Sequence, residues 1–179
     1  MGQYHLTANL TKKEFIHPHK LGAGLKLWEQ IANPVGPAQA LIVLLAGSNG
    51  RGGGDLHGAV DGRDEKIIGR WAGDRVVIIG DYGEAGDYKR KPGDVDGAHL
   101  YGAIMGDDGK GSPDWRDVSE LVAPILERTL GIRFKGDGWR GYERAPGADY
   151  SIIAEPHEQA EPAMRPDMIL VAAKDSGSR

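Results

Sequence analysis

Arg75-Val76-Val77-Ile78-Ile79-Gly80-Asp81 is the stretch of the sequence that most clearly predicts an element of structure. Its four consecutive β-branched residues favour a strand, and turn-forming residues lie on both sides of them. A continuous apolar run of this length is typical of a buried strand. We therefore expect residues 75–81 to lie in the interior of a sheet, with the neighbouring segments packed around it.

Other segments also have strand patterns. In residues 4–10 apolar and polar side chains alternate, and Phe15 with Ile16 forms a short apolar pair after a charged turn. Residues 100–105 predict a strand that neighbours residues 75–81. Residues 168–173, Met-Ile-Leu-Val-Ala-Ala, predict a further buried strand late in the chain.

Three segments have helical patterns. Residues 23–32 place apolar side chains at helical spacing and end before a proline. Pro37 is suited to the first turn of a second helix, which is apolar all round at residues 41–45 and is therefore expected to be buried on nearly every side. The strongest pattern covers residues 113–130, with a kink or break expected at Pro124 and an end at Gly131.

The order of these segments predicts the fold class. Strands come first, then two helices, further strands, a long helix and a final strand, which differs from the regular alternation of a doubly wound sheet. We therefore predict an α+β fold, with a mixed or mostly antiparallel sheet packed against two to four helices. Residues 1–179 are expected to form a single domain, in which residues 131–167 are a loosely structured, loop-rich appendage.

Composition limits the classes of function. The chain has 28 glycines among 179 residues, about twice the usual share, and their distribution between apolar runs predicts many turns and long loops. Lysine and arginine total 22 against 26 acidic residues, which argues against bulk nucleic-acid binding. The absence of cysteine excludes disulfides, thiolate metal sites and cysteine nucleophiles.

The hydropathy pattern gives an expected location. The first residues lack the pattern of a signal peptide, and the longest apolar run, residues 40–46, is too short to cross a bilayer. We therefore expect a cytoplasmic protein without a membrane partner.

A glycine-rich tract, Gly-Ser-Asn-Gly-Arg-Gly-Gly-Gly-Asp, covers residues 47–55. It lacks the Lys-Ser/Thr pair of a P-loop, and it follows a predicted helix instead of the strand that a dinucleotide-binding loop requires. Its backbone N–H groups and Arg51 are nevertheless suited to holding a small anion.

Two histidine motifs are candidates for a metal site. His17-Pro18-His19 has two imidazoles that point to the same side if the backbone is extended, and Asp55-Leu56-His57 has a carboxylate and an imidazole at the same spacing. These four ligands suit zinc or manganese, which can activate water for hydrolysis. The hypothesis of a metal-dependent hydrolase requires all four side chains to converge, with Asp81 as a possible general base.

Two carboxylates flank the predicted strand at residues 75–81. Asp74 and Asp81 lie at its opposite ends, roughly 23 Å apart if the backbone is extended, so they do not form one carboxylate pair. A second alternative, a nucleotide-acting enzyme without metal, would use Arg51, Arg70 and Asp74.

The favoured hypothesis is a small binding or interaction protein, because the motifs tested for catalysis are missing and the loops are long. Its partner would be another protein or a small anionic ligand. Candidate ligand-binding residues are Arg51, Arg70, Asp74 and Tyr82. Tyr82, Tyr88, Trp139 and Tyr142 are the aromatic residues expected to contribute to such a surface, together with the polar stretch 83–98.

Three stretches carry a resemblance to other proteins: residues 1–5 (Met-Gly-Gln-Tyr-His), residues 13–27, which include His-Pro-His-Lys-Leu-Gly-Ala-Gly-Leu-Lys-Leu, and residues 69–82, from Gly-Arg-Trp-Ala-Gly-Asp-Arg to Gly-Asp-Tyr. They resemble a group of small uncharacterised proteins from bacteria and phages, over about the first half of the chain. Members of the group often have Gly-Asp-Gly where this chain has Gly22-Ala23-Gly24. The resemblance implies a shared fold and, by analogy with phage proteins, a small regulatory or interaction role.

Overall fold

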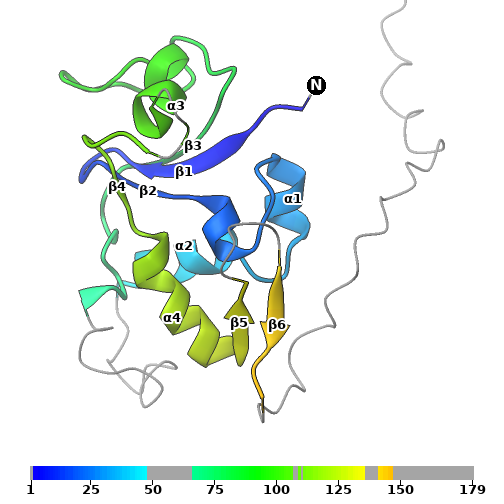
Figure 1. Cartoon of the computed structure of the whole chain (residues 1–179). Helices are drawn as coiled ribbons and strands as arrows, with labels where there is room; N and C mark the ends of the chain where they lie inside the picture. Colours follow the sequence, from blue (N-terminus) through cyan, green and yellow to red (C-terminus); the bar gives the residue numbers. More distant parts are fainter. Residues whose placement is uncertain (1, 48–65, 107–108, 110, 136–140, 147–179) are drawn as a thin grey trace, which may run out of the picture.

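The computed structural model describes residues 2–47, 66–106, 109, 111–135 and 141–146. The elements are β1 (His5–Asn9), β2 (Glu14–Ile16), the 3-10 helix η1 (Pro18–Leu21), α1 (Leu27–Ala32), α2 (Pro37–Leu45), β3 (Val76–Gly80), α3 (Gly97–Met105), β4 (Arg116–Asp117), α4 (Ser119–Leu130), β5 (Ile132–Phe134) and β6 (Tyr142–Arg144). Helices pack on a mixed four-stranded sheet, and β5 pairs with β6 in a small second sheet (Figure 1). The predicted α+β class is confirmed.

The main sheet has the strand order β3-β1-β2-β4. β1 is antiparallel to both β2 and β3, whereas β4 runs parallel to β2. β3 therefore lies at an edge of the sheet, and the side chain of Ile78 at its centre is 47% exposed. The prediction of a strand here is correct, but the expected position in the interior of the sheet is wrong, because among the described residues β3 pairs with β1 alone.

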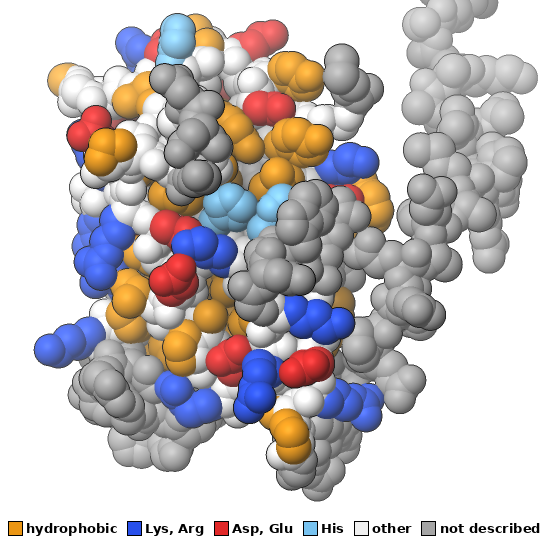
Figure 2. Space-filling model, in the orientation of Figure 1, with side chains coloured by type: hydrophobic (Ala, Val, Ile, Leu, Met, Phe, Trp, Pro, Cys, Tyr) orange, Lys and Arg blue, Asp and Glu red, His pale blue; other side chains and the backbone are white. Residues whose placement is uncertain are grey.

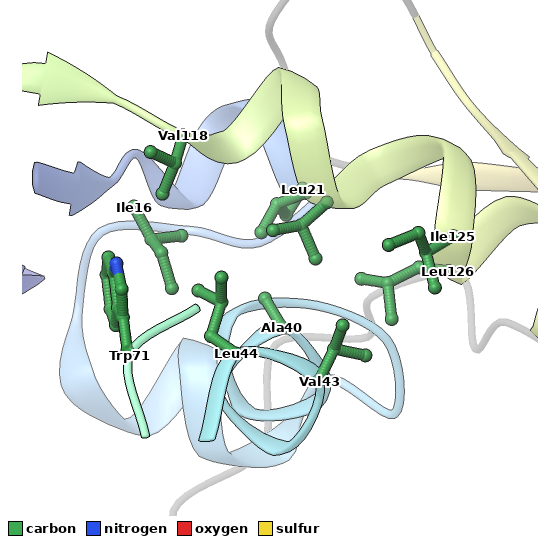
Figure 3. Packing of buried hydrophobic residues seen from close by; sticks show 10 residues of the cluster. Ile16, Leu21, Ala40, Val43, Leu44, Trp71, Val118, Ile125 and Leu126 are labelled. Carbon is green, nitrogen blue, oxygen red and sulfur yellow. The ribbon is translucent and has the colours of Figure 1, made fainter. Parts of the chain in front are cut away.

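Apolar side chains fill both faces of the sheet. α3 covers one face (Figure 1), and the buried residues there are Leu6, Ala8, Phe15, Ile79, Leu100, Ile104, Met105 and Trp115. Those on the opposite face are Ile16, Leu21, Ala40, Val43, Leu44, Trp71, Val118, Val122, Ile125 and Leu126. Figure 3 shows the side chains of α2 and α4 meeting in this second cluster, with Trp71 beside Ile16 at one end. As a result β1 is buried on both faces.

α3 occupies residues for which we predicted a strand. The Asp96 carboxylate caps the helix by accepting the Ala98 N–H at 3.0 Å. Leu100 and Ile104, four residues apart, are both buried against the sheet, as the helical period requires. The prediction of a strand at residues 100–105 is wrong, because a short apolar run does not distinguish a strand from a buried helix.

α4 begins later than predicted. Residues 113–118 form a turn and β4 instead of the first turns of the helix, since the N–H groups of Arg116 and Val118 donate to carbonyls of Lys13 and Phe15, both at 2.9 Å. Trp115 packs under α3. Pairing with β2 therefore replaces the start of the helix that the sequence pattern favours.

Of the features predicted further along α4, the end at Gly131 is confirmed, and the helix is not broken at Pro124. The helix continues from Ser119 to Leu130 with Pro124 inside it, so it is not split in two. Gly131 ends it with a left-handed backbone conformation, φ 62°, which costs glycine little. β5 and β6 follow as a hairpin, and Ile132 and Tyr142 pack against Val35. The predicted strand at residues 168–173 lies outside the described residues.

α2 begins at Pro37 as predicted, but it is not buried all round. Its buried side chains are Pro37, Ala40, Val43 and Leu44. Ile42 is 71% exposed, since no described residue covers this face of the helix. The pattern of residues 41–45 therefore indicated more burial than the fold provides.

Candidate binding surface

α1 exposes its large apolar side chains. The helix begins at Leu27, whereas the sequence pattern predicted a start at Ala23. Leu27 is 38%, Trp28 49% and Ile31 75% exposed, while Glu29 and Gln30 are buried. A surface helix usually has the reverse arrangement, so the apolar face of α1 is directed to solvent.

Hydrogen bonds explain why the polar side chains point inward. Gln30 Nε2 donates to the backbone carbonyls of His5 at 2.8 Å and Leu25 at 3.0 Å. Glu29 Oε2 accepts the backbone N–H of Lys26 at 3.1 Å, which caps the helix. These bonds satisfy backbone groups near the start of β1 and fix the rotation of the helix.

Gly24 makes room for the buried Glu29. A Cβ atom at position 24 would lie 1.9 Å from Glu29 Oε2 and 2.4 Å from its Cδ. A side chain at position 24 would force the Glu29 carboxylate to move, so the glycine leaves the space in which that carboxylate reaches the Lys26 N–H. Gly24 thus provides the space for the buried Glu29 to cap α1.

An open hollow of about 460 Å³ lies beside α1. Its lining consists of Gly2, Gln3, His5, Lys26, Leu27, Trp28 and Ile31. We call the exposed apolar face of α1 and this hollow the α1 surface. It is largely apolar and has one lysine, so it is suited to an apolar side chain with a neighbouring negative charge.

Two of the predicted ligand-binding residues belong to structural ion pairs. The buried Glu14 carboxylate accepts hydrogen bonds from Arg70 and, at 2.8 Å, from Trp71 Nε1. Burial raises the pKa of Glu14, but the bonds from Arg70 and Trp71 outweigh it and hold the pKa below its usual value. The Asp74 carboxylate accepts a hydrogen bond from Lys12 Nζ and another, at 2.8 Å, from Asn9 Nδ2. Arg70 and Asp74 therefore connect β1 and β2 to the segment before β3.

Asp81 and Tyr82 follow the other end of β3. Asp81 Oδ1 accepts the Tyr4 backbone N–H at 3.0 Å, and Tyr82 is 61% exposed. Asp74 and Asp81 lie at opposite ends of the strand, as predicted. Asp81 thus holds the start of β1 by a hydrogen bond, while the side chain of Tyr82 is exposed to solvent.

The stretch 83–98 is held to the domain by several polar contacts. Arg75 Nη1 bonds the Asp94 carboxylate at 2.8 and 3.1 Å. The Tyr88 hydroxyl donates to the Val95 carbonyl, so that tyrosine is engaged within its own loop. Tyr142 is buried beside Val35 and Ile132, so the expectation that it contributes to a binding surface is wrong. Trp139 lies outside the described residues.

His17 and His19 lie together. Their ring centroids are 5.3 Å apart with an angle of 49° between the planes, and Figure 2 shows two histidine side chains side by side, next to charged ones. The expected extended backbone is present at His17, but Pro18 begins η1, so the 3-10 turn brings the rings together. The His17 N–H donates to Ser119 Oγ at 2.8 Å.

Only half of the predicted metal site lies in the part of the chain that the structure describes. Asp55, His57 and also Arg51 lie outside it. Among the described residues, no three histidine, cysteine or acidic side chains lie close enough together to hold a metal ion. Burial lowers the pKa of His17 although the nearby Asp117 carboxylate raises it, and the neutral imidazole that results is the form that binds metals.

Comparisons with known proteins give no relatives: no family model, curated protein or solved structure matches this sequence. Among the described residues, none of the helices combines the length and the apolar character that a membrane crossing requires.

Proposed function

We propose that this protein is a protein-binding module and that the α1 surface is its binding site. The observation that supports the proposal is the inverted helix, with Glu29 and Gln30 buried while Trp28 and Ile31 face solvent. Burying apolar area contributes about 25 cal/mol per Å², so a fold that leaves these side chains exposed forgoes stability. Clustered apolar exposure of this kind is typical of interaction sites.

The composition of the surface indicates the chemistry of the partner. Tryptophan is enriched among the residues that dominate binding energy at protein interfaces. The hollow beside Trp28 accommodates an apolar or aromatic side chain, and Lys26 on its lining provides a cation. We infer that the partner presents an apolar anchor residue with an acidic residue next to it.

Binding measurements with matched variants test this proposal. Peptides of random sequence are selected on the full-length protein, and the dissociation constants of the enriched ones are compared for wild type, Trp28→Ala and Ile31→Glu. We expect enrichment of an apolar residue near an acid, and a loss of affinity of about tenfold or more for each variant, since a central anchor contributes about 2 kcal/mol or more.

Ile42→Glu is the control, because Ile42 is 71% exposed on α2, away from the hollow. It is expected to keep the affinity of wild type. If Ile42→Glu weakens peptide binding as much as Ile31→Glu does, or if none of the three substitutions changes the dissociation constant, the binding site lies elsewhere. All three positions are at least partly exposed, so the variants are expected to fold, and their melting temperatures check this.

The metal-dependent hydrolase is the second candidate, and the close pair of rings at His17 and His19 favours it. It still requires Asp55 and His57 to join this pair. The nucleotide-acting enzyme has less support, because Arg70 bonds Glu14 and Asp74 bonds Lys12 and Asn9.

A further inference from the structure

β3 has backbone groups that point away from the sheet. Hydrogen bonds join Leu10 N to Arg75 O at 2.9 Å and Asp81 N to Tyr4 O at 3.0 Å, at the two ends of the β1–β3 ladder. In an antiparallel ladder every second residue faces the partner strand. By this alternation the N–H and C=O groups of Ile78 point to the side opposite β1.

In the part of the chain that the structure describes, this open edge lacks the usual protection. Proteins protect exposed strand edges with lysine, proline, bulges or a covering segment. β3 reads Val-Val-Ile-Ile-Gly, with neither a charge nor a proline. No hydrogen bond from another described residue reaches the backbone of Ile78 on its open side, and its side chain is 47% exposed. Such an edge is suited to pairing with a further strand.

A late segment of the sequence matches this edge. Residues 168–173, Met-Ile-Leu-Val-Ala-Ala, are uncharged and apolar, and they are comparable in length to β3. The chain can reach the edge: residues 147–167 span up to roughly 70 Å when extended, whereas a domain of this size has a radius of gyration of about 15 Å.

The flanking charges favour one direction of pairing. β3 lies between Arg75 and Asp81, and the segment 168–173 lies between Asp167 and Lys174. A parallel arrangement places Asp167 near Arg75 and Lys174 near Asp81, so both ends combine opposite charges. The antiparallel arrangement would place like charges together at both ends, which is unfavourable.

We propose that residues 168–173 of the same chain add to the open edge of β3 as a further strand, parallel to β3. The added strand pairs with the outward backbone groups of Ile78 and covers its side chain. It also prevents the edge from pairing with other chains. This inference concerns β3 and is independent of the binding site proposed on α1.

The natural absence of cysteine allows a direct test by disulfide formation in the full-length chain. Ile78→Cys is combined with a cysteine at position 169, 170 or 171, and oxidation is followed by mass spectrometry. We expect an intrachain disulfide for at least one pair. Ile42→Cys, on a more exposed site of α2, is the control and is expected to form none with the same partners. Similar yields at positions 42 and 78, or none at 78, would overturn the proposal.

Two further results distinguish the direction of pairing and whether the added strand comes from the same chain or from a second copy. Tyr82→Cys is expected to form a disulfide with Ala173→Cys in preference to Met168→Cys, because the parallel direction brings residue 173 to that end of β3. The opposite preference contradicts the parallel arrangement. Disulfides that form between two chains instead of within one would identify a second copy as the occupant and refute the intramolecular pairing.

Hydrogen exchange in the full-length protein tests the same pairing without cysteines. Leu170→Pro removes a backbone N–H from the segment and disfavours its pairing. We expect exchange at the Ile78 amide to accelerate by about tenfold or more, while Ile79, whose amide faces β1, stays unchanged. Gln159→Pro, between the domain and the segment, is the control. Equal exchange at Ile78 in wild type and Leu170→Pro would refute the pairing.

Discussion

The carboxylate of Glu14 on β2 accepts hydrogen bonds from Nε and Nη2 of Arg70, 56 residues further along the chain. Trp71 Nε1 donates to the same carboxylate at 2.8 Å, and the indole is fully buried in the cluster beneath the sheet. The pair thus attaches the segment before β3 to the centre of the sheet. The Glu14 side chain is only 4% exposed, so water has little room to replace Arg70.

Removing Arg70 should therefore destabilise the fold strongly. Arg70→Met leaves the Glu14 carboxylate buried without its cation, and we expect the free energy of unfolding to fall by about 3 kcal/mol or more. Lys12→Met is the comparison, because Lys12 is more exposed in its pair with Asp74, and such pairs contribute about 1 kcal/mol or less. Urea unfolding measures both. Equal losses for the two variants would contradict the structural role of Glu14 and Arg70.

The same carboxylate gives stability a defined pH dependence. The pKa of folded Glu14 lies below 4.5, its usual value, so the unfolded state binds the proton more tightly. The stabilisation is complete above pH 4.5 and is lost as the pH falls through the lower folded pKa. In urea unfolding, the advantage of wild type over Glu14→Gln is expected to be constant well above pH 4.5 and to shrink as the pH falls below 4.5. An advantage that grows on acidification would reverse the predicted sign.

The strands were predictable where pattern and burial agree. β1 and β2 have the alternation or apolar pairs that the sequence indicated, and β3 has a β-branched run. Position within the sheet was not predictable, since the same run fits a central strand and an edge strand. The start of α4 was misplaced for a related reason. Its local pattern favours helix from residue 113, but long-range pairing with β2 determines the backbone at residues 116–118.

The candidate surface was the part that the sequence predicted least. Spacing identified the apolar side chains of α1, but periodicity does not tell which face of a helix is inside. That depends on Gln30, whose amide reaches the carbonyls of His5 and Leu25. The sequence contains Gly24 and Glu29, five residues apart, but only the structure shows that the glycine leaves space for the buried glutamate. The sequence placed the His17 and His19 rings on the same side only for an extended backbone, whereas the rings come together through a 3-10 turn that begins at Pro18.

Gly24→Ala should disrupt α1. The new methyl group would displace the Glu29 carboxylate from the Lys26 N–H, and loss of a helix cap costs about 1–2 kcal/mol. We expect a lower free energy of unfolding in urea and weaker binding by peptides that recognise the α1 surface. Gly102→Ala is the matched control on α3. A Cβ there meets no atom within 4 Å, so alanine should stabilise the helix by about 0.5–1 kcal/mol. A neutral Gly24→Ala would show that Glu29 does not depend on the glycine.

The metal-dependent alternative predicts that the protein is stabilised by zinc or manganese, which a thermal-unfolding measurement tests. Zinc or manganese added to metal-stripped protein at 100 times its dissociation constant should raise the free energy of unfolding by about 2.7 kcal/mol. His17→Gln and His57→Gln should each abolish the resulting shift in melting temperature, because both side chains are required ligands. His17 is neutral at pH 7, since burial lowers its pKa, so the shift should persist at that pH.

His99→Gln is the control for this measurement, because His99 is exposed on α3, away from the pair of rings at His17 and His19. It should leave the zinc-dependent shift intact. A shift that survives His57→Gln but not His17→Gln would mean that the rings at positions 17 and 19 bind zinc without the glycine-rich segment. The site would then lack the four ligands that the hydrolase requires. No shift with either metal would remove this alternative and leave the α1 surface as the functional site to pursue.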